Sequence, residues 1–226
     1  KVSARATPYV AWHTTGSKQA QKPLRVGFVS GDLNFHPVGM FLLNVLCFLD
    51  NTKVSCIAYS NCHVEDDISA ALRPHFAEWN AVARLNDAAL AQKIHHDRID
   101  VLVDLAGHTG QSRISVFAWR PAPVQVSWLG YWASTGLAEM DYLLADRTSV
   151  HTDDAAYYSE RIWYLPDTRL CFARPPIDMH AWPADPVPAL ANGYVTFGCF
   201  QNITKLTDLT LTMWAQVLAH FPIARF

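Results

Sequence analysis

Short apolar runs alternate with longer segments of mixed polarity between residues 24 and 165. The runs have the length of buried strands, and several of the segments between them have apolar positions at helical spacing. The expected strands are Leu24–Val29, Val54–Tyr59, Ile99–Leu105, Val124–Leu129, Tyr142–Ala145 and Ile162–Leu165. The expected helices are Gly39–Leu49, Asp67–Leu72, Asp87–His96, which Asn86 would cap, and Ser112–Ala118. Strands that alternate with helices predict βαβ units, and hence an α/β domain over residues 24–173 with a mainly parallel sheet.

The alternation stops at residues 174–193, which are rich in proline and are expected to link two domains. After them, the apolar run Tyr194–Phe200 predicts a strand, and Thr207–His220 predicts an amphipathic helix. This pair indicates the first βα unit of a second Rossmann-like domain, residues 194–226. The polar residues 1–23 show little periodicity and are expected to form a linker or arm. Because the first residue is Lys, the chain is expected to be part of a longer protein.

The 18 basic and 20 acidic residues nearly balance, so charge gives no reason to expect nucleic acid or an anionic membrane as a partner. The most apolar stretch, around Val38–Leu49, is too short to span a bilayer and is typical of a buried helix. The five cysteines form no CxxC pair and are expected to be reduced core residues of a cytoplasmic protein. The histidines lack ligand spacing, so no metal site is expected.

Four loops follow expected strands and carry reactive side chains, at the edge where open α/β sheets bind ligands. In the first loop, His36 stands before an apolar helix and either holds a substrate hydroxyl or phosphate or caps the helix. Asp32 in the same loop is expected to be a turn or cap residue. In the second loop, His108 lies between Gly107 and Gly110 and either contacts a ligand or is buried in a tight turn.

The third and fourth loops suggest a sugar and a phosphate. Thr135 and Gly136 belong to a small polar loop among aromatic residues, which suits a sugar or a peptide but is also compatible with ordinary aromatic core. Gln201, Asn202 and Lys205 lie between the expected strand and helix of the second domain. A lysine ahead of a helix N-terminus can pair with a diphosphate, or it can simply be a solvated lysine.

Five ordered segments resemble the catalytic region of the O-linked N-acetylglucosamine transferase family, specifically its bacterial members. They are LRVGFVSGDLNFHPVG, IDVLVDLAGHTGQSR, RPAPVQVSWLGYWASTGLAEMDY, YSERIWYLPDT and VTFGCFQNITKL, and the resemblance runs from about Leu24 to the last residue. It implies a GT-B glycosyltransferase, in which two Rossmann-like domains face each other across a cleft. It also implies a preceding tetratricopeptide region, to which residues 1–23 would lead.

The resemblance also implies roles for individual residues. The family's active-site histidine falls on His36 and its diphosphate-contacting lysine on Lys205. The family's amide upstream of that lysine falls on Asn202, with Gln201 beside it. Bacterial and plant relatives share the turn around His108, whereas animal enzymes differ. A second histidine of the animal enzymes is replaced here by Met40 or a neighbour. The loop YWAST, which ends at Thr135 and is followed by Gly136, departs from the animal form, so acceptor preference stays open.

The implied activity is inverting transfer of N-acetylglucosamine from UDP-GlcNAc to Ser or Thr of proteins. The partners are then a nucleotide sugar and a protein or peptide acceptor. No metal cofactor is expected if Lys205 and helix N-termini neutralise the diphosphate. The alternatives are another donor, GDP-fucose or UDP-glucose, and a non-catalytic binding or scaffold module that keeps the fold.

Overall fold

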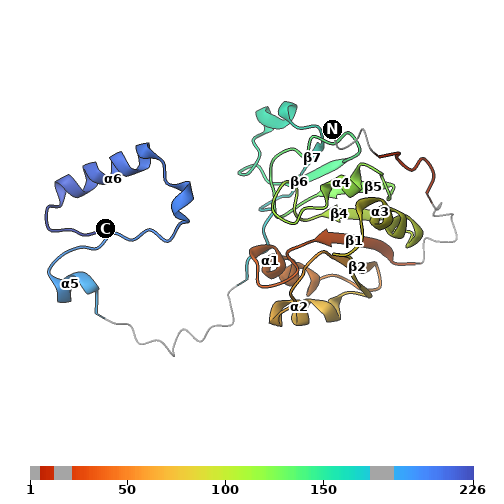
Figure 1. Ribbon diagram of the computed structural model, residues 1–226, viewed down its shortest axis with the longest axis horizontal. Coiled ribbons are helices and arrows are strands. Elements are labelled where there is room, and N and C mark those ends of the chain that lie inside the picture. Colours follow the sequence, from red (N-terminus) through yellow and green to blue (C-terminus); the bar gives the residue numbers. More distant parts are fainter. Residues whose placement is uncertain (1–5, 13–21, 174–185) are drawn as a thin grey trace. The chain divides into compact units, whose positions relative to one another are not determined.

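The computed structural model describes residues 6–12, 22–173 and 186–226 (Figure 1). The chain divides into two compact units, Lys1–Ala173 and Arg174–Phe226. The expected linker residues 174–185 and residues 1–5 and 13–21 of the expected arm lie outside the described residues.

A seven-stranded parallel sheet forms the centre of the first unit. Its strands are β1 (Leu24–Ser30), β2 (Val54–Ser60), β3 (Glu78–Ala81), β4 (Val101–Asp104), β5 (Val124–Ser127), β6 (Tyr142–Ala145) and β7 (Arg161–Tyr164). Every neighbouring pair is parallel, and the spatial order is β3-β2-β1-β4-β5-β6-β7. The predicted α/β fold with a mainly parallel sheet is therefore confirmed, and the apolar runs predicted every one of these strands except β3.

Helices cover both faces of this sheet (Figure 1). They are α1 (Pro37–Leu46), α2 (Asp67–Leu72), α3 (Asp87–His96) and α4 (Ile114–Phe117), with short 3-10 helices η2 (Arg73–His75) and η3 (Thr152–Tyr157). Phe28 of β1 belongs to the core cluster that contains α1 and α2 residues, and Val29 belongs to the cluster that contains α3 and α4 residues. Successive side chains of β1 thus point to opposite faces. Burial on both faces explains why the strands are almost continuously apolar.

The strand order reverses between β1 and β4. The chain runs from β1 outward to β2 and β3, crosses back to β4, and continues outward to β7. Ligands of open α/β sheets bind at such a reversal, because the loops that follow the two strands separate toward opposite faces. The loops after β1 and β4 contain His36 and His108, so the topology places both histidines at this point of the sheet.

The edge strand β3 escapes prediction from the hydrophobic pattern. Its sequence, Glu78-Trp79-Asn80-Ala81, has no apolar run, and its side chains are exposed or half-buried. It pairs with β2 on one side. An edge strand with one partner and one solvated face needs no continuous apolar segment, which removes the signal that revealed the central strands.

The second unit contains α5 (Pro188–Asn192), η5 (Ile203–Lys205) and α6 (Asp208–His220). The predicted helix is confirmed as α6, with Thr207 as its N-cap. The predicted strand Tyr194–Phe200 is wrong: within the described residues this run makes one isolated bridge, between Thr196 and Arg225. A strand needs a partner along its whole length for its backbone groups, and this run finds one only around Arg225.

Two further segments differ from a plain linker and arm. Residues 188–192, expected to belong to the linker, form α5, which ends at Gly193 in the left-handed conformation with φ 73°. Residues 6–12 of the expected arm pack on the first unit. The ring of Tyr9 stacks on His95 with centroids 4.0 Å apart, and Trp12 Nε1 donates to the carbonyl of Arg120 at 3.0 Å.

Candidate active site

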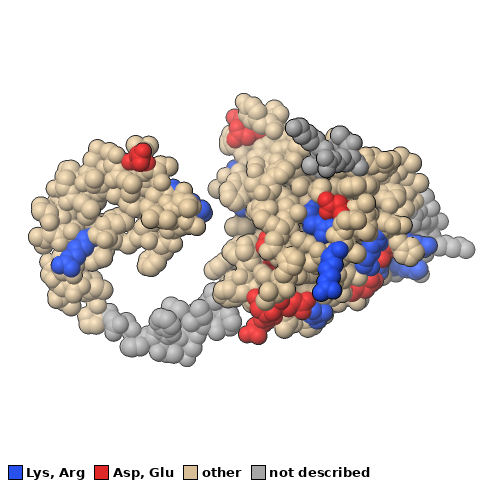
Figure 2. Space-filling model, in the orientation of Figure 1, with Lys and Arg blue, Asp and Glu red and all other residues tan. Residues whose placement is uncertain are grey.

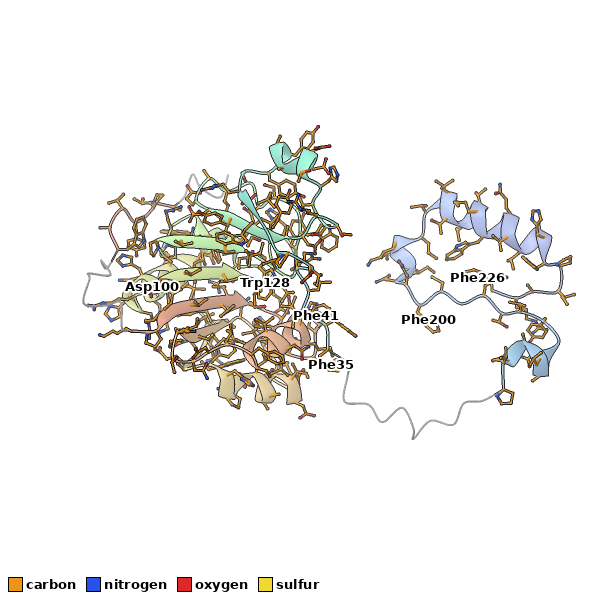
Figure 3. The ribbon with its side chains drawn as sticks, turned by 180° about the vertical axis from the view of Figure 1, so that it is seen from behind. Phe35, Phe41, Asp100, Trp128, Phe200 and Phe226 are labelled. Carbon is orange, nitrogen blue, oxygen red and sulfur yellow. The ribbon has the colours of Figure 1, made fainter. Side chains whose placement is uncertain are left out.

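The carboxyl edge of the sheet gathers the loops that follow β1, β2, β4 and β5. Phe35 and Trp128, which follow β1 and β5, lie at this edge, and Asp100, which precedes β4, lies at the opposite edge (Figure 3). Asn61 after β2 donates its side-chain N–H to the carbonyl of Gln111 after β4, at 3.0 Å. The candidate residues of the first unit are therefore carried by loops that contact one another.

Two glycines allow these loops to approach closely. A Cβ atom at Gly130 would lie 2.1 Å from the carbonyl oxygen of Leu105 and 3.1 Å from Cγ2 of Val38. A Cβ atom at Gly39 would lie 2.3 Å from the carbonyl oxygen of Asn34. The shortest of these distances are far inside van der Waals contact, so any side chain would push the loops apart. Gly130 lets the β5 loop reach both the β4 loop and the first turn of α1, and Gly39 lets the loop after β1 fold closely against α1.

His36 is the N-cap of α1. Its backbone is extended, Pro37 takes the first helical position, and its Nδ1 accepts the N–H of Val38 at 3.2 Å. The loop before it is tied to α2, because Asp66, the N-cap of that helix, also accepts the N–H of Phe35 at 2.6 Å. Both alternatives foreseen for His36 thus concern the same side chain: one nitrogen caps the helix and the other is left for a ligand.

The bond from Val38 assigns the neutral tautomer of His36. Because Nδ1 accepts an N–H, the imidazole proton sits on Nε2, and a side chain that is 46% exposed presents this nitrogen as a donor. Asp32 Oδ2 lies 3.9 Å from Nδ1. Burial raises the pKa of Asp32, and the charge of His36 opposes this shift. The sequence predicted Asp32 to be a turn or cap residue. In the structure its carboxylate also lies beside His36 and interacts with it electrostatically.

His108 presents the opposite arrangement. Its Nε2 lies 2.9 Å from the carbonyl oxygen of Thr135. Since a carbonyl only accepts, Nε2 carries the proton and Nδ1 carries a lone pair. The imidazole is exposed and meets the ring of Tyr131 edge to face, with centroids 5.5 Å apart. Its exposure rules out the alternative of a histidine buried in a tight turn.

Thr135 is buried and already bonded. Its N–H donates to Oε1 of Glu160 at 2.7 Å, and its hydroxyl donates to the same oxygen. Its backbone carbonyl accepts from His108, so Thr135 supports that histidine, and the predicted contact of Thr135 with substrate stays a prediction. The next residue, Gly136, is exposed and has a φ of 69°, a conformation that favours glycine.

Asp104 is a buried carboxylic acid at the end of β4. Its carboxylate accepts the N–H groups of Ala106 at 3.2 Å and Gly107 at 2.7 Å. Burial raises the pKa of Asp104 to about 6, and these hydrogen bonds and the charge of His108 oppose the shift. Acids that titrate near neutral pH are concentrated in functional sites. Asp104 is therefore a candidate residue that the sequence pattern did not single out.

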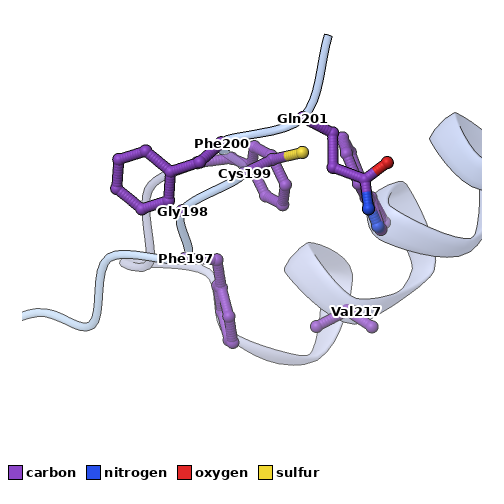
Figure 4. A pocket seen from close by; sticks show the side chains of 8 residues that line it. Phe197, Gly198, Cys199, Phe200, Gln201 and Val217 are labelled. Carbon is purple, nitrogen blue, oxygen red and sulfur yellow. The ribbon is translucent and has the colours of Figure 1, made fainter. Parts of the chain in front are cut away.

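The predicted donor-side residues belong to the second unit. Asn202 Oδ1 accepts the N–H and the hydroxyl of Thr204, each at 3.0 Å, and so caps η5. Lys205 ends η5, is exposed, and precedes the N-terminus of α6. Gln201 lines an open pocket of about 490 Å³ with Phe197 and other mainly apolar residues (Figure 4). The mainly apolar lining of this pocket offers few hydrogen-bond donors to a diphosphate. Lys205 and the backbone N–H groups at the start of α6 do offer such donors.

Comparison with known proteins identifies the family. The sequence model of glycosyl transferase family 41 matches residues 3–174. The chain belongs to glycosyl transferase family 41. A structure of a mutant O-GlcNAc transferase from Thermobaculum terrenum has a TM-score of 0.83 and 38% identity with this family 41 chain, covering 97% of it and 40% of that protein. This likeness confirms both the resemblance and the GT-B assignment.

Two plant relatives extend the comparison. A protein of Arabidopsis thaliana, named probable UDP-N-acetylglucosamine–peptide N-acetylglucosaminyltransferase SPINDLY, is 34% identical over 221 residues. The corresponding protein SEC of the same plant is 29% identical over 214 residues. The family 41 chain covers 24% of the length of the first and 21% of the second.

The surface of the family 41 chain carries both charge signs. On the visible face of the first unit acidic and basic side chains lie close together, while most of the second unit is uncharged (Figure 2). No helix among residues 6–12, 22–173 and 186–226 is long and apolar enough to cross a membrane.

All five cysteines are free, but among them Cys56 alone is buried, so the expectation that they are core residues is wrong for the other four.

Glu160 and Asp104 are the residues that sequence reasoning missed. Asp104 could have been found, because a carboxylate that ends an apolar strand and precedes small residues has few other ways to be solvated. Glu160 left no such signal, since its partner Thr135 is 25 residues away in the chain.

Proposed function

We propose that this family 41 chain is part of a protein O-glycosyltransferase that moves N-acetylglucosamine from UDP-GlcNAc to Ser or Thr hydroxyls with inversion. The observation that carries the proposal is the 38% identity and TM-score of 0.83 with an O-GlcNAc transferase over 97% of the chain. The plant relative named as a UDP-N-acetylglucosamine–peptide transferase supports the same donor and a peptide acceptor.

The reaction forms a bond between the acceptor oxygen and the anomeric carbon and breaks the bond from that carbon to UDP. Alignment of hydroxyl and anomeric carbon supplies much of the rate in such a transfer. Stabilisation of the charge on the departing UDP supplies the rest. Lys205 and the N-terminus of α6 are the positive groups assigned to the diphosphate. The proposal includes no metal, because these groups take its place.

His36 is assigned to hold a substrate oxygen through its Nε2–H. To act as a general base, His36 would need a free lone pair on Nε2 and therefore its proton on Nδ1. The hydrogen bond from the N–H of Val38 to Nδ1 disfavours that tautomer. The proton of the acceptor hydroxyl is therefore assigned to another base, for which a relay water or the donor phosphate is available in this chemistry. Asn202 also shapes the turn that presents Lys205. The substrate-side residues of the proposal are His108, Thr135, Gly136, Gln201 and Asn202.

Two rival functions keep the same fold. GDP-fucose or UDP-glucose in place of UDP-GlcNAc changes the donor and not the site residues of the first unit. A non-catalytic scaffold keeps the fold without transfer. The exposed imidazoles of His36 and His108 at the strand-order reversal favour an enzyme, because a scaffold has no need of them there.

The test is intact-mass measurement of an acceptor protein incubated with the full-length gene product. Separate reactions contain UDP-GlcNAc, UDP-glucose or GDP-fucose, whose sugars add different masses. We expect the increment of N-acetylglucosamine, lost in Lys205→Ala and kept in Lys53→Ala. Lys53 is the matched control because its side chain is 79% exposed and it precedes β2, at the opposite edge of the sheet. Another increment would identify a rival donor, and no increment in any reaction would support the scaffold.

A cytoplasmic location and a preceding tetratricopeptide region that recruits protein acceptors complete the proposal. The tetratricopeptide region comes from the resemblance to the O-linked N-acetylglucosamine transferase family, and the location is also supported by five cysteines without a CxxC pair. Fractionation of cells that produce the full-length protein tests the location.

A further inference from the structure

The two candidate histidines of the first unit offer a ligand different hydrogen-bonding groups. His36 accepts an N–H at Nδ1 and so presents a donor, Nε2–H. His108 gives Nε2–H to the Thr135 carbonyl and so presents an acceptor, the lone pair on Nδ1. A hydroxyl of a sugar or a peptide side chain can donate one hydrogen bond and also accept hydrogen bonds, so a donor and an acceptor at one edge of the sheet use both of its capacities, whereas two donors use only one.

The partner of His108 is itself held by a buried acid. Glu160, 4% exposed, precedes β7 and accepts the N–H and the hydroxyl of Thr135 through one oxygen. Its other oxygen accepts the hydroxyl of Ser134 at 2.9 Å. Three bonds from consecutive residues to one carboxylate fix the peptide whose carbonyl faces His108, and so fix the direction in which that carbonyl points.

We propose that Glu160 is a positioning residue that acts through Thr135 to hold His108 with its proton on Nε2, leaving Nδ1 as the hydrogen-bond acceptor of the site. Near His108 also lie the ring of Tyr131 and the carboxylate of Asp104, which already accepts from Ala106 and Gly107. Thr135 thus supplies the acceptor that selects the tautomer. The inference rests on the proposed function for its meaning, since the Nδ1 lone pair then orients a substrate hydroxyl.

The tautomer is measured directly by long-range ¹H–¹⁵N correlation spectra of the ¹⁵N-labelled chain. A pH of about 8 keeps ordinary imidazoles neutral. His108→Gln, at an exposed position, assigns the signals by their loss. We expect a protonated, pyrrole-type Nε2 and a pyridine-type Nδ1 for His108. A pyridine-type Nε2, or averaged shifts for both nitrogens, in the unaltered chain would overturn the proposal.

Substitutions then test the part assigned to Glu160. Glu160→Ala is expected to move both ¹⁵N shifts of His108 toward the averaged value, and Glu160→Gln, which keeps an acceptor for the Thr135 N–H, to restore most of the difference. Asp146→Asn is the matched control: this carboxylate is 5% exposed at the same edge and accepts from Thr148, Ser149 and Arg169, with no bond to Thr135. Unchanged shifts in Glu160→Ala, or an equal change in the control, would refute the role.

A graded variant covers the case in which Glu160→Ala fails to fold. Thr135→Val removes the hydroxyl bond to Glu160 and keeps the backbone bond, so a smaller move of the His108 shifts in the same direction is expected. Shifts identical to those of the unaltered chain would count against the proposal. None of these spectra depends on sugar transfer, so a failed transfer assay with the expected tautomer would reject the proposed function alone.

Discussion

His36 combines a helix cap and a candidate catalytic group in one side chain, so substitutions have to separate the two. Asn is a good N-cap and lacks the imidazole, whereas Ala lacks both. In the complete enzyme we expect His36→Asn and His36→Ala each to lower turnover roughly a hundred-fold. We expect only His36→Ala to lose stability, by about 1 kcal/mol. Turnover assays and thermal unfolding measure the two effects, and unchanged turnover in His36→Asn would leave His36 as a cap alone.

Asp104 predicts how stability depends on pH. Burial raises its pKa in the folded chain to about 6, above the ordinary value of 3.8. The folded state therefore binds more protons than the unfolded state between these values, and its stability falls as the pH rises through them. A pKa shift of this size corresponds to a contribution of about 3 kcal/mol to the free energy of unfolding. This contribution is present at low pH and is fully lost above the pKa of the folded state.

The measurement compares urea unfolding of the chain and of Asp104→Asn at several values of pH. Asp104→Asn is also expected to change the free energy of unfolding by an amount that does not depend on pH, because an amide pairs differently with the N–H of Gly107. The free energy of unfolding of the unaltered chain minus that of the variant is expected to fall by about 2 kcal/mol between about pH 4 and pH 7. A difference that stays constant with pH would show that Asp104 titrates normally.

At the scale of elements, the site depends on the close packing of loops more than on any helix or strand. Gly130→Ala would place a methyl group 2.1 Å from the carbonyl oxygen of Leu105. We expect a loss of about 2 kcal/mol or more in the free energy of unfolding, because backbone and not a flexible side chain has to move. Gly110→Ala in the β4 loop is the matched control, since its added Cβ would meet no atom within 4 Å. Equal stability of the two variants in urea unfolding would contradict the packing argument.

At the scale of the whole molecule, the chain by itself is expected to bind UDP-GlcNAc weakly and to transfer no sugar. Lys205 is exposed, and an exposed ion pair contributes roughly 0–1 kcal/mol. Micromolar binding requires about 8 kcal/mol. Calorimetric titration of the 226-residue chain with UDP-GlcNAc is expected to show a dissociation constant above the micromolar range. Micromolar affinity would mean that His36 and His108 carry more of the donor site than assigned here.

The sequence by itself determined the central strands, the helices and the loops that carry the chemistry. Buried parallel strands are apolar on both faces, so β1, β2 and β4 stand out as continuous runs, and residues that directly follow such runs lie at the carboxyl edge. His36 and His108 could therefore be placed at one edge before the order of the strands was known. These signals are local, because each depends on a few consecutive residues.

The tertiary structure decided what depends on residues distant in sequence. It alone put β4 beside β1, which creates the reversal between the two histidine loops, and it alone revealed the edge strand β3. It also showed that Tyr194–Phe200 forms one isolated bridge in place of the predicted strand. A segment with strand propensity forms a strand only where a neighbouring segment pairs with its backbone N–H and C=O groups. The nitrogen that each histidine presents is fixed by a backbone partner, two residues away for His36 and 27 residues away for His108. No pattern along the chain records which carbonyl will face an imidazole, since that is set by the packing of β7, through Glu160, against the loop after β5.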